Sequence, residues 1–323
     1  MPLDIRLRRL CWFAMVDFDV LVLAGAGVDT IVRVPELRLP PGDFLPVAPV
    51  RDYVAHSGNG VALGFHALGL RTKFADFAGA DAQGELIRAR YAAVGLDYSG
   101  HPAPNGTPRS VNLVDAAGRR FSFFDGRHPP GTLLPEEFYL PLVERAAHVH
   151  VATQFTPAVW AAARELGVST STDVHAWNGV DEWAWPMAGE ADIVFLSSAA
   201  APERIDDIMR LIATKGRASI VVATEGEHGS RVLAGASGDV QRFPVARPER
   251  PVVDSNGAGD AYSTAFMSRW MRGRPAAECA LAGAVSGAFA CGAPGTHEEL
   301  ITADALDAAV ERARATWPAA PGT

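Results

Sequence analysis

Short apolar runs alternate with helical segments along most of this chain, and this alternation constrains the fold more than any other feature. Phe18–Val34 is a continuous apolar run, as strands buried on both faces of a parallel sheet tend to be, and we expect it to form one strand. Arg71–Asp97 then reads as strand, turn and helix, and the rhythm returns over Ala146–Gly235. Parallel strands joined by helices form βαβ units. We therefore predict an α/β fold with a central, mostly parallel sheet flanked by helices.

Two segments break this rhythm and favour a small β layer. Residues 107–126 read as two alternating strands around an Ala-Ala-Gly turn, which predicts a hairpin. With the irregular, proline-rich residues 32–54, this hairpin is predicted to supply the strands of a lid. No repeat or low-complexity linker divides the chain, so residues 15–315 are predicted to form a single domain. Residues 1–14 are predicted to be an extension, either a non-native start or disordered, and residues 316–323 a tail.

Composition argues against several classes of function. The chain has 323 residues, 48% of them hydrophobic, so it can bury a large core. With 29 Lys and Arg against 37 Asp and Glu, a net charge of −8 and no long basic run, no nucleic-acid partner is expected. The apolar run near the N-terminus is too short for a membrane helix, so no membrane partner is expected. Three cysteines without metal-ligand spacing favour a cytoplasmic location: Cys11, Cys279 and Cys291.

One short stretch carries candidate chemistry. Val252–Phe266 reads VVDSNGAGDAYSTAF, with Asp260 directly after a run of small residues where a strand leads into a helix. Small residues let several backbone N–H groups point at one spot, and in the first turn of a helix these donors make an anion pocket. A carboxylate at its rim suits a base that takes a proton from a hydroxyl while the amides hold transferred charge. The alternative, an acid that only stabilises its helix, stays open on this stretch alone.

This stretch resembles the C-terminal signature of the PfkB/ribokinase family of carbohydrate kinases, D-[ST]-x-G-A-G-D followed by a helix of small residues. Three further segments match the family in order: DVLVLAGAGVDTIVRVP, HSGNGVALGFHALGLRTKFADFAGADAQG and VVATEGEHGS. They resemble its opening strand with a substrate-binding aspartate, its Gly-rich segment with G-x-D-x-x-G, and its nucleotide loop. The likeness covers about residues 18–300. It implies a ribokinase-like fold with a small β lid and ATP-dependent transfer of the γ-phosphoryl group to a small sugar or sugar-like acceptor.

The resemblance also implies roles for single residues. Asp260 would be the general base, and the backbone amides of residues 257–259 the anion hole. The implied sets are the anion hole Asn256, Gly257, Ala258 and Gly259; the acceptor-binding Asp29, Gly58 and Asn59; the ATP-binding Thr224, Gly226 and Gly229; and Asp254 for a monovalent cation such as K⁺.

The chain departs from the family pattern where Mg²⁺ would be held. Ser197 and Ala200 stand in place of the Asn and Glu of N-x-x-E. Either Glu203 or another carboxylate substitutes, or Mg²⁺ arrives with the nucleotide, since it keeps much of its water shell and leans on substrate phosphates. Reduced or absent kinase activity is a third alternative. The Mg²⁺ site is therefore not assigned from the sequence.

Two glycines mark further departures. Gly60 lies near the place of an acceptor-binding Asn, one position after Asn59, and Gly283 stands where a polar Asn often lies near the nucleotide base. Unusual contacts to both ligands are therefore expected.

Several histidines lie in segments that the resemblance places near the cleft. For His56, His128 and His175, an exposed or packed ring is favoured over a ligand role. His148 and His150 lie on one face of a strand, and without a third ligand nearby a metal pair is not expected.

The favoured function is a carbohydrate kinase that uses ATP and Mg²⁺, with K⁺ as a further candidate cofactor. A nucleoside or vitamin-precursor kinase of the same fold is the first alternative. A non-catalytic ligand-binding or regulatory protein that retains the fold is the second. Exposed lid strands need covering, and members of the family often pair their lids, so a homodimer is expected.

Overall fold

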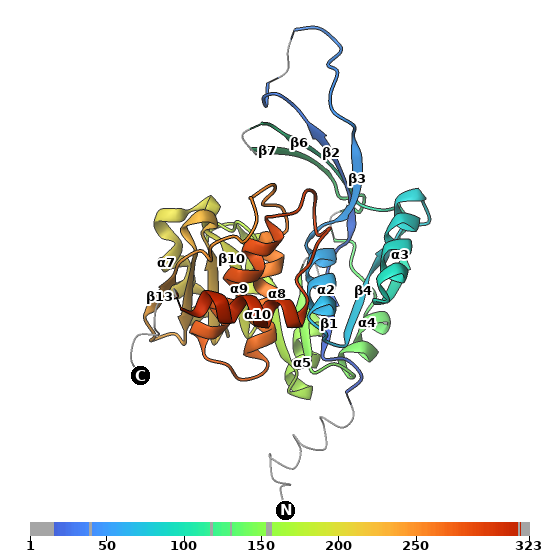
Figure 1. The fold of residues 1–323 in the computed structure, drawn as a ribbon. Helices are drawn as coiled ribbons and strands as arrows, with labels where there is room; N and C mark the ends of the chain where they lie inside the picture. Colours follow the sequence, from blue (N-terminus) through green and yellow to red (C-terminus); the bar gives the residue numbers. More distant parts are fainter. Residues whose placement is uncertain are drawn as a thin grey trace, which may run out of the picture.

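A large parallel sheet organises the structure. The computed structural model describes residues 16–38, 41–116, 119–129, 131–152, 157–315 and 317. Within them, nine strands lie in the order β13-β12-β11-β10-β9-β8-β1-β4-β5 (Figure 1). All neighbours from β11 to β5 are parallel, whereas β12 and β13 are antiparallel. The strands are β1 Val20–Leu23, β4 Thr72–Ala78, β5 Asp97–Pro102, β8 His148–Val151, β9 Ser169–Asp173, β10 Ile193–Ser197, β11 Ile220–Thr224, β12 Ser230–Ala234 and β13 Val240–Phe243.

Helices cover both faces of this sheet, as the predicted βαβ rhythm requires. One hydrophobic core unites α2, α3, α8, α9 and α10 with the sheet, and a second core unites α4 to α7 with the opposite face. The four residues of β1 alternate between the two cores and are fully buried. The helices are α2 Ser57–Ala67, α3 Ala82–Val94, α4 Glu136–Val143, α5 Pro157–Leu166, α6 Trp185–Ala188, α7 Ile205–Lys215, α8 Ala258–Trp270, α9 Ala276–Ala290 and α10 Ala303–Arg314.

A second, smaller sheet projects from the body as a lid (Figure 1). Its strand order is β3-β2-β6-β7, and the hairpin pattern is seen as β6 and β7 in antiparallel register. Its strands are β2 Gly27–Arg33, β3 Arg51–Ala55, β6 Arg109–Val114 and β7 Arg120–Asp125.

The expectation of one continuous strand over Phe18–Val34 is wrong. The run divides at residues 24–26 into β1 of the large sheet and β2 of the lid. Small residues at the division allow a close approach: Gly58 donates its N–H to the carbonyl of Gly25 at 3.0 Å. The lid therefore starts directly at the carboxyl end of a central strand.

Other elements differ from their predicted bounds or were missed. The helix predicted within Val252–Phe266 begins at Ala258, and β13, α4 and α10 were not predicted as separate elements. The predicted extension over residues 1–14 lies outside the described residues. Of the predicted tail, Trp317 alone is described, and its ring stacks on Phe243 with the centroids 6.1 Å apart.

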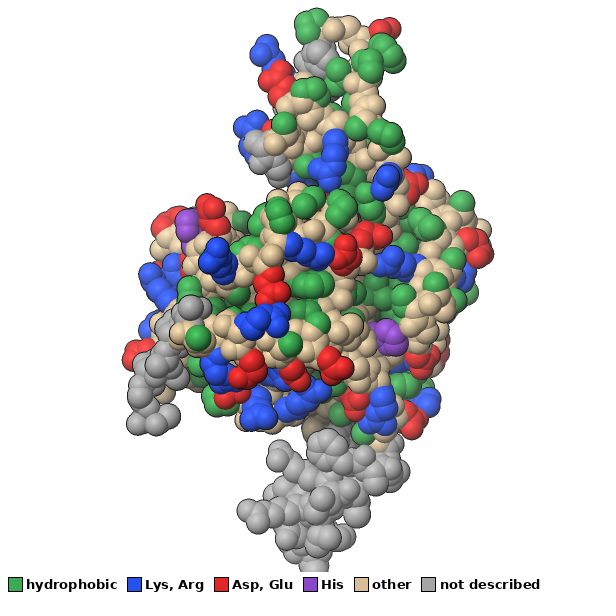
Figure 2. Space-filling model, in the orientation of Figure 1, with side chains coloured by type: hydrophobic (Ala, Val, Ile, Leu, Met, Phe, Trp, Pro, Cys, Tyr) green, Lys and Arg blue, Asp and Glu red, His purple; other side chains and the backbone are tan. Residues whose placement is uncertain are grey.

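Charges are mixed over the visible surface. On the face in Figure 2, acidic and basic side chains are interspersed over the body, and the lid stands clear of it. None of the helices in the described ranges has the length and apolar character needed to span a bilayer.

Candidate functional site

Asp260 lies in the first turn of α8, at the edge of the sheet where the parallel strands end. The helix begins after Gly257, whose φ of 76° is left-handed and suits glycine. Among the described residues no side chain caps this helix. Ala258 donates its N–H to the carbonyl of Ser255 at 3.3 Å, whereas the N–H groups of Gly259 and Asp260 have no acceptor among the described residues. A Cβ at Gly259 would meet nothing within 4 Å. The helix start therefore offers donors and open space to an anion, with the Asp260 carboxylate beside them.

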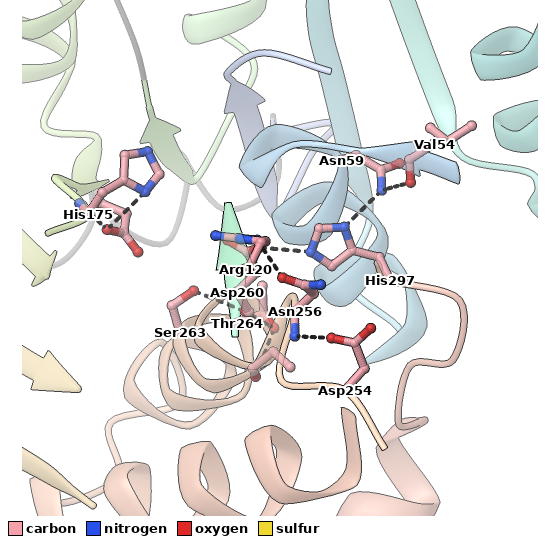
Figure 3. A network of polar contacts seen from close by, with 12 residues as sticks. Val54, Asn59, Arg120, His175, Asp254, Asn256, Asp260, Ser263, Thr264 and His297 are labelled. Atoms are coloured by element: carbon pink, nitrogen blue, oxygen red, sulfur yellow. Dashed lines mark hydrogen bonds and ion pairs between the residues drawn. The ribbon is translucent and has the colours of Figure 1, made fainter. Parts of the chain in front are cut away.

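His297 contacts this carboxylate, and the sequence analysis missed it. Its Nε2 lies 2.7 Å from Asp260 Oδ2, and its side chain is only 1% exposed (Figure 3). The ring follows α9 in the stretch GAPGTHEEL, which matches no motif that names a histidine. Only the tertiary structure brings it 37 positions back along the chain to Asp260.

Asp254 lies beside the start of α8 and is well supplied with donors. Its carboxylate accepts from the N–H of Asn256 at 3.0 Å and from that of Gly295 at 3.4 Å. A cavity of about 10 Å³ is lined by Asn256, Gly257 and Gly295 together with six further residues, and Asp254 is not among them. The role of Asp254 toward a monovalent cation remains a prediction.

Two lid arginines reach the same segment, and the sequence analysis missed both. Arg33, at the end of β2, lies 3.4 Å from Asp254 Oδ2. Arg120, at the start of β7, donates to Asn256 Oδ1 (Figure 3). Positive charge from the lid therefore lies against the predicted anion hole.

Asp29 lies in lid strand β2, is 7% exposed, and faces the body. Asn112 donates to its Oδ2 at 2.8 Å, and His56 Nε2 lies 3.4 Å from its Oδ1. Burial raises the pKa of Asp29, but the hydrogen bonds from His56, Ser110 and Asn112 and the charge of His56 outweigh it and leave the pKa below its usual value. Asp29 is therefore an ionised acceptor of hydrogen bonds.

A cavity of about 520 Å³ lies between lid and sheet. Its wall includes Asp76, His56, His128 and His175, so all three histidines that were expected to be packed or exposed face one cavity. It is lined by Gly25, His56, Ser57, Asp76, Phe77, Pro108, Phe124, Gly126, His128, Pro129, Thr132, Leu134 and His175. This size and the aromatic lining fit an organic ligand.

Asp76 is the carboxylic acid of that wall. Its two oxygens accept from the N–H groups of Ala26 and Phe77, each at 2.6 Å. Burial raises its pKa to about 7, against the two backbone hydrogen bonds, which lower it. The sequence analysis did not single it out, because nothing local marks an acid within a strand as facing a cavity.

Gly58 and Asn59, predicted to hold the acceptor, lie at the start of α2. A Cβ at Gly58 would fall 2.5 Å from the carbonyl oxygen of Gly25, so this position needs glycine. Asn59 is fully buried. Its amide nitrogen donates to the carbonyl of Val54 and contacts Nδ1 of His297, each at 3.1 Å. Their roles toward an acceptor remain predictions.

The predicted ATP-binding residues cluster at the loop after β11. Thr224 ends that strand, and Gly226 and Gly229 have φ of 58° and 93° in the turn after it. A Cβ at Gly283 would fall 2.9 Å from the ring of Tyr262, whose hydroxyl lies 2.9 Å from Ser230 Oγ. The departure at Gly283 therefore makes room for an aromatic ring that links α8 to this loop.

The residues at the end of β10 stand in place of the family's N-x-x-E motif. Ser197 accepts from the N–H of Ala199, and Glu203 is exposed at a short 3-10 turn. Over the described ranges, no three His, Cys, Asp or Glu side chains cluster so that they could hold a metal. The side chains of the described residues do not form a protein-built Mg²⁺ site.

The histidines of β8 are structural. His148 contacts Ser169 and Ser171, and His150 contacts Ser171, at 2.7–2.9 Å. Burial lowers the pKa of His148 to about 3 and that of His150 to about 4. Both rings are therefore neutral at pH 7.

Comparisons with a family model and with a characterised relative both point to carbohydrate kinases. A family model described as pfkB family carbohydrate kinase matches residues 53–303. The chain is 43% identical over 292 residues to acarbose 7(IV)-phosphotransferase of Actinoplanes sp., and the match covers 89% of this chain and 97% of that protein.

Solved structures agree. The microbiome-derived acarbose kinase Mak1 has a TM-score of 0.84 and 41% identity, covering 91% of this chain and 99% of its own. Ribokinase from Giardia lamblia has a TM-score of 0.79 over 91% of this chain and 99% of its own, and at 15% identity it shows the fold alone.

Proposed function

The chain belongs to the pfkB family of carbohydrate kinases, and we propose that it phosphorylates a hydroxyl group of a sugar-derived acceptor held in the cavity under its lid. It is an ATP-dependent sugar phosphotransferase with a ribokinase-like fold. The roles of single residues, the acceptor and the cations belong to the proposal.

The observation that carries the proposal is the position of Asp260. The Asp260 carboxylate lies in the first turn of α8, where the N–H groups of Gly259 and Asp260 have no acceptor among the described residues and the space beside Gly259 is open to an anion. Asp260 also acts electrostatically on Asp173 and His150 at the ends of β9 and β8, in keeping with a position at the carboxyl edge of the sheet. Ligands of open α/β sheets bind at this edge.

The chemistry follows from this geometry. Asp260 takes the proton of the acceptor hydroxyl as the oxygen bonds to the γ-phosphorus, while the bond from that phosphorus to the ADP oxygen breaks. The N–H groups at the start of α8 stabilise the charge on the transferred group. Arg33 and Arg120 on the lid add positive charge on the same side. Closure of the lid would exclude water that otherwise hydrolyses ATP.

The acceptor is proposed to be larger than one sugar ring. A cavity of about 520 Å³ lies within the range of pockets for drug-sized ligands, and Phe77 and Phe124 offer flat apolar walls to sugar rings. Two relatives above 40% identity are named for acarbose. We therefore propose acarbose, or a sugar-derived molecule of similar size, as acceptor. Of the predicted acceptor-binding residues, Asp29 lies beside His56 of the cavity wall, whereas Gly58 and Asn59 do not line the cavity.

ATP is proposed to lie along Thr224, Gly226 and Gly229. Since the described side chains form no carboxylate cluster for it, Mg²⁺ is proposed to arrive with the nucleotide, where it neutralises phosphate charge. Asp254 is proposed to help bind K⁺ beside the anion hole. Dependence of turnover on KCl, with no response to choline chloride, is expected, and equal rates in both salts would refute this K⁺ site.

A homodimer through the lid is proposed from the lid's outer face. Val111, Phe121 and Phe123 lie on one side of β6 and β7 and are 39%, 55% and 57% exposed. An apolar face of this kind is typical of a covered surface. Light scattering should give twice the chain mass, and a monomeric mass would refute this assembly.

The decisive experiment measures ADP release with a panel of acceptors: acarbose, ribose, fructose, a keto-deoxy sugar acid and adenosine. Turnover is expected with acarbose and not with adenosine. Preference for adenosine would favour a nucleoside kinase. Binding of any of these without turnover would favour a ligand-binding protein that retained the fold.

A further inference from the structure

Asn59, His297 and Asp260 form a chain of contacts that ends at the carboxylate of the proposed base (Figure 3). Asn59 Nδ2 lies 3.1 Å from His297 Nδ1, and His297 Nε2 lies 2.7 Å from Asp260 Oδ2. Both Asn59 and the ring of His297 are buried. The three side chains come from α2, from the segment after α9 and from α8, so the contact joins distant parts of the chain.

The contacts fix the tautomer of His297. Asn59 must direct its nitrogen toward Val54, because a backbone carbonyl can only accept, and the same nitrogen faces His297 Nδ1. An amide nitrogen only donates, so Nδ1 must accept. The proton of the neutral ring therefore lies on Nε2, which donates to Asp260 Oδ2.

The surrounding backbone is shaped to admit this ring. A Cβ at Gly60 would lie 2.2 Å from His297 Nε2, and a Cβ at Gly257 would lie 2.5 Å from its Cδ2. His297 itself has a φ of 60°, which is uncommon for a residue with a side chain. The guanidinium of Arg90 donates a hydrogen bond to the carbonyl oxygen of His297 at 2.8 Å. Gly60, a departure from the family pattern, thus has a physical reason here.

We propose that His297 is a positioning residue that holds the carboxylate of Asp260 in one orientation for phosphoryl transfer. The inference rests on the proposed role of Asp260 as base. With Oδ2 bound to His297 Nε2–H, Oδ1 is the oxygen left to receive the acceptor proton. His297 does not take that proton, because Nε2 is already protonated and Nδ1 is occupied by Asn59. A carboxylate that rotated freely would spend less time aligned with the hydroxyl, and misplacement by about 1 Å can cost about 100-fold in rate.

The test compares His297→Met with His297→Gln. Met and Gln side chains are unbranched and similar in length, so the two variants carry a similar backbone strain at the left-handed φ. Only Gln retains an N–H donor near the position of Nε2. His297→Met should lower kcat about 10- to 100-fold with the acceptor KM within about threefold, and His297→Gln should recover most of that loss. Equal kcat in the two variants, or a rise in KM with kcat unchanged, would overturn the inference.

A double-mutant cycle separates positioning from stability. In an Asp260→Asn background, His297→Met should lower the residual kcat little further, whereas a merely structural role would lower it by the same factor as in the wild type. Near-normal turnover in Asp260→Asn alone would sink the proposed function. Low turnover in Asp260→Asn with normal turnover in His297→Met would sink only the inference.

A measurement on the wild type covers the case in which His297→Met does not fold. Long-range ¹H–¹⁵N spectra of the histidine side chains should show one Nε2–H ring that disappears in His297→Gln. An Nδ1–H tautomer or a charged ring at that position would overturn the inference.

Discussion

The structure contains two buried or half-buried histidine–carboxylate pairs, and they differ in how tightly each histidine is held. His297 and Asp260 are 2.7 Å apart, whereas His56 and Asp29 are 3.4 Å apart. Both histidines have left-handed φ values, 60° and 71°. In the body, Asn59 occupies the second nitrogen of His297. In the lid pair, one nitrogen of His56 is shared between Asp29 and Ser110, and the ring faces the cavity.

The difference fits two tasks. A base needs a fixed orientation, and His297, whose side chain is 1% exposed, provides it for Asp260. An acceptor-binding acid must adjust to a ligand that enters and leaves, and His56, whose side chain is 16% exposed, leaves Asp29 more of that freedom. The two carboxylates differ less, at 15% for Asp260 and 10% for Asp29. Asp76 is a third case: its carboxylate faces the same cavity with only backbone N–H donors bound to it. Four variants test this comparison.

Asp260→Asn should give the largest effect. Turnover should fall by about 10²–10⁴, the range for loss of a general base, while ATP binding and folding are retained. Steady-state ADP release and nucleotide titration measure the two properties. Asp304→Asn is the matched control, since Asp304 also lies in the first turn of a helix, α10. If both variants only lower stability, Asp260 merely stabilises its helix.

Asp76→Asn should change how stability depends on pH. Burial raises the pKa of Asp76 to about 7 in the folded state, against an ordinary value of 3.8 for an unburied carboxyl. The folded protein then holds a proton that the unfolded chain releases, so stability is lost as pH rises from about 4 to about 7, by up to about 1.4 kcal/mol per pH unit.

Urea unfolding at pH values of about 5, 6, 7 and 8 measures this dependence. The stability of wild type relative to Asp76→Asn should fall by about 2 kcal/mol between about pH 5 and about pH 7 and level off above it. A constant difference over this range would show that Asp76 is ionised throughout.

Asp29→Asn should act on the acceptor and not on the chemical step. Loss of the charge that meets the acceptor should raise its KM about 10-fold with kcat changed about threefold or less. Asp52→Asn, on the exposed side of the neighbouring strand β3, is the matched control. A fall in kcat with KM unchanged would place Asp29 in the chemistry instead.

His56→Asn should give the smallest effect. The weak contact of 3.4 Å to Asp29 predicts a rise in acceptor KM of about two- to fivefold. A loss as large as that of His297→Met would erase the distinction between the two pairs.

Much of the fold could be read from periodicity, because parallel strands and their helices leave a local pattern. The alternation predicted the large sheet, and the alternating pattern over 107–126 predicted the hairpin seen as β6 and β7. The division of Phe18–Val34 could not be read in this way. Both parts are apolar, and only the close approach of Gly58 to Gly25 shows where the chain leaves one sheet for another.

In the candidate site, too, the sequence predicted only residues that belong to a local motif. Asp260 and its glycines were found because anion binding at a helix start needs consecutive residues, which form a motif. His297, Arg33, Arg120 and Asp76 were missed because each meets its partner across 37 or more positions, or acts through a cavity with no local mark.

The sequence by itself determined the α/β class, the family and the identity of the proposed base, since each depends on local order along the chain. The tertiary structure alone decided which side chains surround that base. Packing α2, α8 and the segment after α9 together buries a histidine between two glycines and turns one carboxylate oxygen toward it. Side-chain orientation depends on contacts between distant segments, and these exist only in the folded protein.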